Sequence, residues 1–443
     1  MSHYKPYPAY KNSGVAWIGQ VPEHWEVKPI CRVASCNDDS LPEHVQPDQM
    51  LRYVDISSVN HTDGIAEVAE IRFADAPSRA RRRAKTGDVV ISTVRTYLKA
   101  VAAVTEPYAD CTYSTGFAVL RPRPSEVVPE FLKWLALNDL VIQAIEAHSE
   151  GLSYPAINAT ELVKLKAVVP PPAEQTAIAA AIDRETSRID ALIAKKTRFI
   201  ELLKEKRQAL ITHAVTKGLD PNVEMKDSGV EWIGEVPEHW GVVQIRHVAM
   251  LGSGHTPSRS RPDWWENCYI PWFTLADIWQ VRREGRRYVF ETEEKVSDLG
   301  IANSSATVHP AGSVMLSRTA SVGFPAIMGC DMATSQDFAV WRCGKRLRNE
   351  FLYLVLLGMK QELSRLMIGS THKTIYMPDI EAFRMPLPSL DEQMSIVEHV
   401  DYETTRIDRL TKLTTKSIGL LKERRSAFIT AAVTGQIDLR EGA

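Results

Sequence analysis

The chain has 443 residues, a formal net charge of −2 and 44% hydrophobic residues, which is ordinary for a globular protein of about three domains. The near-neutral charge does not by itself indicate a nucleic-acid partner, so such a partner has to be argued from local basic clusters. No run approaches the ~18–20 apolar residues of a membrane span, and residues 1–10 lack an apolar signal core. We therefore expect a cytoplasmic protein with no membrane partner. The six cysteines show no metal-binding spacing, so we expect free thiols.

A short signature occurs twice. Residues 12–27 (NSGVAWIGQVPEHWEV) and 227–242 (DSGVEWIGEVPEHWGV) are identical at twelve of sixteen positions. Such a repeat indicates a tandem duplication. Large aromatic residues flanked by Gly and Pro are typical of loops docked onto a surface, and we expect this role for Trp17, Trp25, Trp232 and Trp240. His24 and His239 fit packed loop histidines better than metal ligands.

The region after each signature has diverged, but it keeps the same landmarks. Apolar strand patterns at 51–56, 87–92 and 114–119 correspond to patterns at 270–275, 312–317 and 335–340. Apolar helices then begin near Glu130 and Glu350. Strands followed by one or two helices predict an α+β domain in each half.

Basic residues gather in these regions. Residues 79–99 hold seven Lys/Arg against one acid, Asp88, and such clusters are the usual footprint of phosphate contact. The loops 92–97 and 317–321 mix Arg with hydroxyl groups, a combination able to read guanine edges and phosphates. Polar loops at 149–154 and 369–374 lie further along. An alternative for residues 79–85 is a helix with a solvated basic face. The candidate DNA-contacting residues are Arg79, Arg81, Arg82, Arg83, Arg95, Thr96, Tyr97, Lys99, Arg286, Arg287, Arg318, Thr319, Ser321 and Lys373.

Two long helices are predicted at 171–220 and 388–438, and they align at a constant shift of 218 without a gap. Each follows Pro, and the second carries a capping box, Ser389 to Glu392. Their narrow apolar stripes suit a partner helix, as in a coiled coil. At ~1.5 Å per residue each helix would be about 65–70 Å long. Because both copies keep their length, we interpret them as spacers.

Catalytic motifs are missing from the sequence. It contains no GxxxxGK[ST] loop, no GxGxxG, and no Asn/Asp-Pro-Pro-aromatic tetrapeptide of the kind that holds a flipped base. The glycine-rich stretch 252–257 is weak support for phosphate binding. Residues Pro262, Asp263 and Glu266 only partly match a nuclease carboxylate set, and we interpret them as structural.

These motifs together resemble one family, the specificity subunits of type I DNA restriction–modification systems. The matching residues are Trp-Ile-Gly-x-Val-Pro-x-x-Trp at 17–25 and 232–240, Glu-Gln at 174–175 and 392–393, Arg-Ile-Asp at 188–190 and 406–408, and the Ala-Val-Thr ends of both helices. The Gly-x-Thr-Pro-Ser stretch at 254–258 also fits, and the first half lacks it. The resemblance covers essentially the whole chain.

The resemblance implies a domain order with approximate two-fold symmetry and antiparallel long helices. Two target recognition domains would each read one half of a bipartite DNA site, and the helices would set the gap. The expected segments are a signature (1–27), the first target recognition domain (28–170), the central helix (171–220), the repeated signature (221–242), the second target recognition domain (243–387) and the distal helix (388–438).

It also implies partners. Two methyltransferase subunits would dock on the chain and methylate adenine N6 in double-stranded DNA, and two translocase–nuclease subunits can join to cleave unmethylated DNA. S-adenosylmethionine, ATP and Mg²⁺ would be held by those partners, so the chain itself is expected to be non-catalytic and without cofactor or metal. The alternatives are a self-contained adenine methyltransferase or fused restriction enzyme, and a coiled-coil scaffold whose globular regions bind protein.

Overall fold

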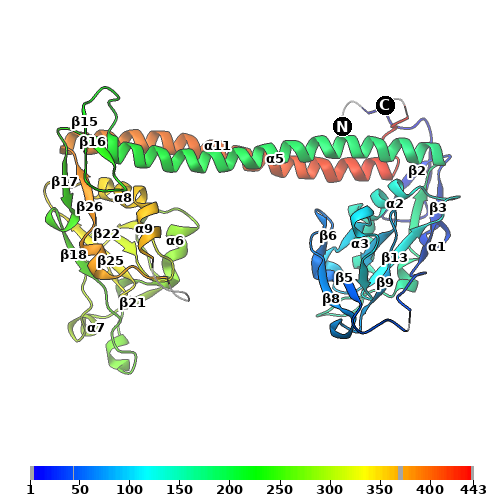
Figure 1. Cartoon of the computed structure of the whole chain (residues 1–443), viewed down its shortest axis with the longest axis horizontal. Helices are drawn as coiled ribbons and strands as arrows, with labels where there is room; N and C mark the ends of the chain where they lie inside the picture. Colours follow the sequence, from blue (N-terminus) through cyan, green and yellow to red (C-terminus); the bar gives the residue numbers. More distant parts are fainter. Residues whose placement is uncertain (1–3, 43, 368–372, 441–443) are drawn as a thin grey trace. The chain divides into compact units, whose positions relative to one another are not determined.

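The computed structural model describes residues 4–42, 44–367 and 373–440. The chain divides into two compact units: unit 1 consists of Met1–Thr197 with Lys416–Ala443, and unit 2 consists of Arg198–Thr415. Two long helices, α5 (Pro172–Lys217) and α11 (Leu390–Val433), contribute a segment to each unit (Figure 1). No helix in the described part of the chain is both long enough and apolar enough to span a membrane.

Unit 1 contains two four-stranded sheets and several short helices. The inner sheet has the order β11 (Val101–Ala103), β10 (Val89–Ser92), β13 (Phe117–Pro122), β4 (Ala34–Cys36). The outer sheet has the order β8 (Ala69–Arg72), β5 (Met50–Val54), β12 (Thr112–Ser114), β9 (Ala80–Arg83). The two-stranded pairs are β1 (Tyr10–Asn12) with β2 (Gln20–Pro22), β3 (Glu26–Pro29) with β14 (Lys166–Val169), and β6 (Val59–Asn60) with β7 (Gly64–Ile65). The short helices are α1 (Ile30–Val33), α2 (Pro129–Ala136), α3 (Asp139–Ala147) and α4 (Ala159–Leu162).

The inner sheet of unit 1 is buried on both faces. Along β10, Val89 and Ile91 join the core formed with α2, α3 and the long helices, whereas Val90 joins the core shared with the outer sheet. Successive side chains of a strand point to opposite faces, so the continuous apolar run of β10 supplies two cores. Figure 1 shows α2 next to the paired long helices, on the side where the strands of unit 1 lie.

Unit 2 repeats this plan with a larger inner sheet. The inner order is β18 (Ala249–Ser253), β25 (Phe338–Cys343), β22 (Val314–Ser317), β23 (Pro325–Met328), β20 (Tyr288–Val289). The outer order is β21 (Glu294–Val296), β19 (Ile270–Phe273), β24 (Ala333–Thr334). The two-stranded pairs are β15 (Met225–Asp227) with β16 (Glu235–Pro237) and β17 (Gly241–Gln244) with β26 (Arg384–Leu387). The short helices are α6 (Trp279–Arg282), α7 (Asp298–Ala302), α8 (Asn349–Gly358), α9 (Lys360–Leu366) and α10 (Met377–Glu381).

The central strand of unit 2 also faces two cores. Val314 and Leu316 of β22 pack with α8 and the long helices, and Met315 packs toward the outer sheet. The same alternation in β10 and β22 agrees with the duplication inferred from the signatures.

The long helices pair antiparallel inside each unit. In unit 1, Arg425 Nε of α11 lies 3.0 Å from Asp190 Oδ1 of α5. In unit 2, Arg207 of α5 forms an ion pair with Asp408 of α11. The capping box predicted at the start of α11 is confirmed, because Ser389 Oγ accepts from the Glu392 N–H at 3.3 Å and Glu392 Oε2 accepts from the Ser389 N–H at 3.1 Å.

One glutamine attaches each globular region to its long helix. Gln175 is fully buried; its Oε1 accepts from the Val128 N–H at 2.9 Å, and its Nε2 donates to Glu126 O at 2.9 Å and Pro170 O at 2.8 Å. Gln393 makes the same three hydrogen bonds in unit 2. They join its Oε1 to Arg348 N at 2.9 Å and its Nε2 to Arg346 O and Pro388 O, both at 3.0 Å. The Glu-Gln motif therefore joins helix to globule.

The predicted α+β class with two long helices is confirmed. The alternative helix at residues 79–85 is wrong, because residues 80–83 form strand β9, which pairs with β12. Successive side chains of the strand point to opposite faces, so Ala80 is buried and Arg83 is exposed.

Candidate nucleic-acid interface

The loop after the central strand has the same backbone path in both units. The third residue after β10 is Arg95, with φ of 51°, and the third residue after β22 is Ala320, with φ of 57°. The residue before each of them forms a β-bridge with the loop that precedes the last short helix: Val94 pairs with Ala156, and Thr319 pairs with Thr374. A left-handed conformation at a residue other than Gly is uncommon and marks functional sites. These central loops (residues 93–99 and 318–323) are therefore built alike with different side chains.

In unit 1 this loop presents a cation beside aromatic rings. The guanidinium of Arg95 lies 5.3 Å from the ring centroid of Tyr154, within cation–π range. The Tyr97 side chain is 53% exposed, and Lys99 also has a positive φ, of 51°. Exposed aromatic rings beside cations suit stacking on bases together with phosphate contact.

Two other residues predicted for unit 1 have internal partners. Thr96 is buried, and its hydroxyl donates to Ser149 Oγ at 2.9 Å. Arg79 is exposed, but its Nη2 lies 2.8 Å from Asp55 Oδ2 and its Nε donates to the Tyr53 hydroxyl at 3.3 Å. Thr96 thus stabilises the loop, and Arg79 could contact phosphate only by sharing its charge with Asp55.

Strand β9 carries the remaining predicted arginines of unit 1. Arg81 lies over Phe73 at 4.9 Å from the ring centroid. Arg82 is partly buried, and its Nε has no hydrogen-bond partner among the described residues. Arg83 is exposed and lines a cavity of about 510 Å³. Of these three arginines, Arg83 is therefore the one placed at a hollow large enough for a nucleobase.

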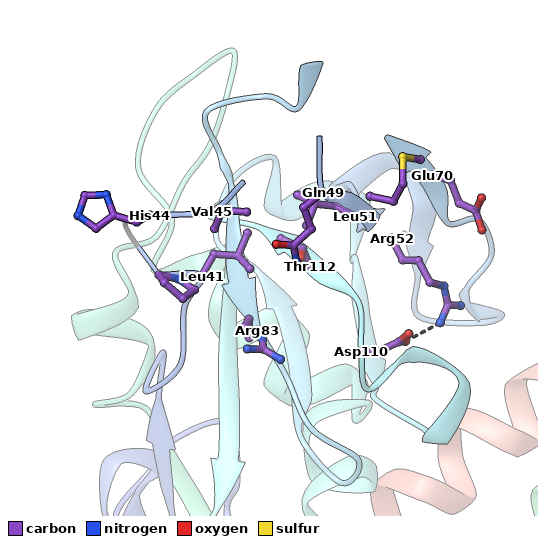
Figure 2. A pocket seen from close by; sticks show the side chains of 12 residues that line it. Leu41, His44, Val45, Gln49, Leu51, Arg52, Glu70, Arg83, Asp110 and Thr112 are labelled. Atoms are coloured by element: carbon purple, nitrogen blue, oxygen red, sulfur yellow. Dashed lines mark hydrogen bonds and ion pairs between the residues drawn. The ribbon is translucent and has the colours of Figure 1, made fainter. Parts of the chain in front are cut away.

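That cavity brings together polar groups from distant segments (Figure 2). Arg52 of β5 and Asp110 form an ion pair at its edge, and Gln49, Thr112 and Arg83 also line it. Guanidinium and amide groups are the side chains that most often read base edges. Sequence reasoning missed Gln49 and Arg52; an arginine within an otherwise apolar strand was the available signal.

The arginines predicted in unit 2 are mostly tied to the protein itself. Arg287 is held by both oxygens of Asp401 on α11, with Nη1 at 2.8 Å from Oδ2. Arg286 Nε lies 2.6 Å from Glu284 Oε2. Arg318 Nε donates to the carbonyl of Gln336 at 3.0 Å. These contacts indicate that Arg287 and Arg318 stabilise the fold of unit 2.

The other predicted residues of unit 2 lie around its central loop. Lys373 is exposed, and its carbonyl accepts from the Ala320 N–H at 2.9 Å. The Thr319 backbone forms the bridge described above, and the Ser321 carbonyl accepts from the Ser317 hydroxyl. In the polar loop predicted at 369–374, residues 369–372 lie outside the described part of the chain.

A cation–aromatic cluster at residues 255–266 was missed as a candidate. Arg259 lies 3.8 Å from the ring centroid of Trp265, and Arg261 lies 5.2 Å from that of Trp264. A polar cavity of about 440 Å³ opens beside them, lined in part by His255. The preceding Gly254 is required by sterics, because a Cβ there would meet the Thr334 carbonyl oxygen at 2.0 Å. The alternation of arginine and tryptophan was the available signal.

The described residues contain no cluster of His, Cys, Asp or Glu that could hold a metal ion. His24 and His239 hydrogen-bond to Glu174 and Glu392, each at 2.8 Å, as expected for packed loop histidines. All six cysteines are free thiols.

Comparisons with known proteins agree with this architecture. Residues 237–419 match the family described as the Type I restriction modification DNA specificity domain. The putative type I restriction enzyme MjaX specificity subunit of Methanocaldococcus jannaschii is 23% identical over 438 residues, covering 96% of each chain. The EcoR124I/EcoR124II specificity subunit of Escherichia coli is 23% identical over 261 residues, covering 57% of this chain and 58% of its own.

Solved structures show the same fold. A chain from a study of complex assembly and conformational transition in the type I R-M system matches with a TM-score of 0.75 and 24% identity, covering 94% of this chain and 99% of the other. The HsdS subunit of Thermoanaerobacter tengcongensis matches with a TM-score of 0.57 and 24% identity, covering 94% and 98%.

A duplicated α+β unit carried on paired long helices is thus the fold of solved type I specificity subunits. Residues 237–419 match the DNA specificity domain of type I restriction–modification systems, and over nearly its whole length the chain is similar to a type I specificity subunit. These relatives are named for specificity, which supports the prediction of a non-catalytic chain.

The central loops allow a direct test. Arg95→Ala is expected to weaken binding of the cognate half-site by about 1–3 kcal/mol, because Arg95 is exposed and its guanidinium lies over the Tyr154 ring. Arg318→Ala is expected to lower the melting temperature as well, because its guanidinium holds the Gln336 carbonyl. Fluorescence anisotropy and thermal unfolding measure the two effects, with Arg188→Ala on the exposed face of α5 as control. Unchanged half-site affinity in Arg95→Ala would show that another loop contacts the DNA.

Proposed function

We propose that this chain is the non-catalytic subunit that directs a type I restriction–modification complex to its DNA site. Residues 28–170 form one target recognition domain and residues 243–387 the other, each binding one half of a bipartite site in double-stranded DNA. The helices at 171–220 and 388–438 set the gap between the half-sites.

The observation that carries the proposal is the same loop built twice with different side chains. Both central loops share a positive φ at their third position and the same β-bridge. The side chains differ, with Arg95 and Tyr97 in unit 1 aligned to Ala320 and Val322 in unit 2. Equal backbones with unequal polar groups suit two readers of unlike base sequences.

Two methyltransferase subunits would bind the chain and methylate adenine N6, and two translocase–nuclease subunits would join for cleavage. S-adenosylmethionine, ATP and Mg²⁺ would be bound by those partners. The chain contributes the choice of site, and the reaction takes place in the partners.

Methylation-aware sequencing tests the proposal directly. A host strain carrying the chain with its methyltransferase partner is expected to show methylated adenines in a split, asymmetric motif with a constant gap. Deleting the gene for this chain should abolish that motif. A contiguous motif, or methylation that persists after the deletion, would overturn the assignment.

A measurement on the purified chain separates DNA binding from a protein-scaffold role. The logarithm of the DNA affinity should fall linearly with the logarithm of salt concentration, with a slope of about −0.9 per phosphate contact. Arg83→Ala should reduce both affinity and slope if Arg83 contacts a phosphate. Absence of salt-dependent binding would favour the scaffold alternative, and adenine methylation by the chain alone would favour the self-contained enzyme.

A further inference from the structure

A tyrosine fills a pocket beside the signature tryptophan of unit 1. The ring of Tyr7 lies 5.6 Å from that of Trp25 and 5.8 Å from that of His24, between centroids. Its hydroxyl donates to Glu174 at the start of α5, and the Arg440 guanidinium lies 4.9 Å from its centroid. Tyr7 is only 3% exposed. Burial first, and then the hydrogen bond to Glu174, raise its pKa, so the phenol remains a donor.

Unit 2 has the same pocket without the ring. Its walls include Trp240, His239 and Glu392, the repeat equivalents of Trp25, His24 and Glu174. They surround a cavity of about 230 Å³ whose lining also includes Ile396 and Leu219. The residue at the repeat position of Tyr7 is Asn222, which is exposed.

The difference follows from how the chain runs past the two pockets. In unit 1 two separate segments meet there, and the Asp438 N–H donates to the Lys5 carbonyl at 2.8 Å. In unit 2 a single segment, residues 218–224, covers the span from the end of α5 to β15. It leaves Leu219 42% exposed, whereas the corresponding Ile437 is 6% exposed.

The carboxylates also differ in their donors. Trp240 Nε1 donates to Glu392 Oε1 at 3.0 Å. Trp25 Nε1 is buried and has no hydrogen-bond partner among the described residues. Burial opposes ionisation of Glu392, but hydrogen bonds from Trp240, His239 and Ser389 outweigh it and lower its pKa to about 2. In the filled pocket the phenol has taken the place of the indole as donor to the glutamate.

We propose that the cavity of unit 2 binds a tyrosine side chain presented by a partner protein. The cavity is smaller than the ~300–1,000 Å³ of drug-sized ligand sites, so it fits a single side chain. An ionised carboxylate repels phosphate and accepts from a phenol, which favours a protein side chain over nucleic acid as the occupant. The ring packs on Trp240 and Ile396, and its hydroxyl donates to Glu392, as Tyr7 does in unit 1.

The proposal requires discrimination between tyrosine and phenylalanine. A phenylalanine ring would fill the same space but would separate Glu392 from solvent without donating to it. A site whose acceptor becomes covered by the bound ring rejects the analogue that lacks the hydroxyl more strongly than a purely apolar site does.

The test uses the full-length chain, N-acetyl-tyrosinamide and nuclear magnetic resonance of the tryptophan indole groups. The tyrosine amide is expected to shift the Trp240 indole signal saturably as the hydrogen bond to Glu392 is exchanged, and to leave Trp25 unchanged because its pocket is filled. N-acetyl-phenylalaninamide should bind at least tenfold more weakly. No saturable shift of Trp240, or equal affinity for the two amides, would overturn the proposal.

A variant adds an independent arm. Asn222→Tyr places a phenol at the repeat position of Tyr7 and should abolish the response to the tyrosine amide. An undiminished response in this variant would contradict the proposal, and the comparison of the two amides on the unmodified chain remains decisive if the variant misfolds. A Trp240 signal that changes with protein concentration alone would assign the cavity to a second copy of this chain instead.

Discussion

Replacing Gln393 by Ala is expected to lower the free energy of unfolding of unit 2 by about 2–5 kcal/mol, since unpaired buried polar groups cost about 1–3 kcal/mol each. The side chain is fully buried and makes three hydrogen bonds to main-chain groups. The truncation leaves the Arg348 N–H and the carbonyls of Arg346 and Pro388 without their hydrogen-bond partner. Because these groups join the globular region to α11, the globular region and the start of α11 should both become less stable.

Hydrogen exchange resolves the effect by unit. Exchange in Gln393→Ala should rise at residues 346–356 and at the start of α11, while unit 1 stays protected. Gln175→Ala is the matched variant and should give the mirror result in unit 1, at residues 126–136. Met394→Ala, at an exposed neighbouring position, is the control. Unfolding curves that match the unmodified chain in both glutamine variants would show that the motif does not join helix to globule.

Shortening the long helices is expected to change the DNA site itself. Removing four residues shortens a helix by ~6 Å, which is close to two base steps of about 3.4 Å. If helix length sets the gap, the methylated motif should keep both half-sites and lose about two base pairs between them.

The pairing in unit 1 defines a balanced deletion. Asp190 faces Arg425, so residues 193–196 lie opposite residues 419–422, and both sets should be removed together to keep the register beyond them. Lys195→Ala, which is exposed and preserves length, is the control. Methylation-aware sequencing measures the gap in the methylated motif. The same gap in the deletion strain as in the parent would show that the length of these helices does not set it.

The sequence predicted the repeated elements closely, because a duplication provides its own comparison. The helices foreseen at 171–220 and 388–438 are α5 (Pro172–Lys217) and α11 (Leu390–Val433). The strand patterns at 87–92 and 312–317 became β10 and β22. Local period and turn residues were enough for these elements.

The availability of the basic residues could not be predicted in this way. Arg287 is held by Asp401, which is 114 residues further along the chain, and Arg318 by the carbonyl of Gln336. Both partners are set by tertiary packing. Arg52 lines the cavity of unit 1, and the apolar pattern of its strand does not distinguish it from an arginine on a solvated strand. A basic cluster identifies a region, and tertiary contacts decide which of its members are free.

The two-faced burial of β10 and β22 bears on how such a protein can evolve. Alternate side chains of each strand belong to different cores, one shared with the long helices and one shared with the outer sheet. An insertion or deletion of one residue would exchange the two sets, so these strands should be fixed in length across lineages. Substitutions at every second position would change only the side chains that face the outer sheet. Recombination that replaces the outer sheet would therefore leave the side chains that pack on the long helices unchanged.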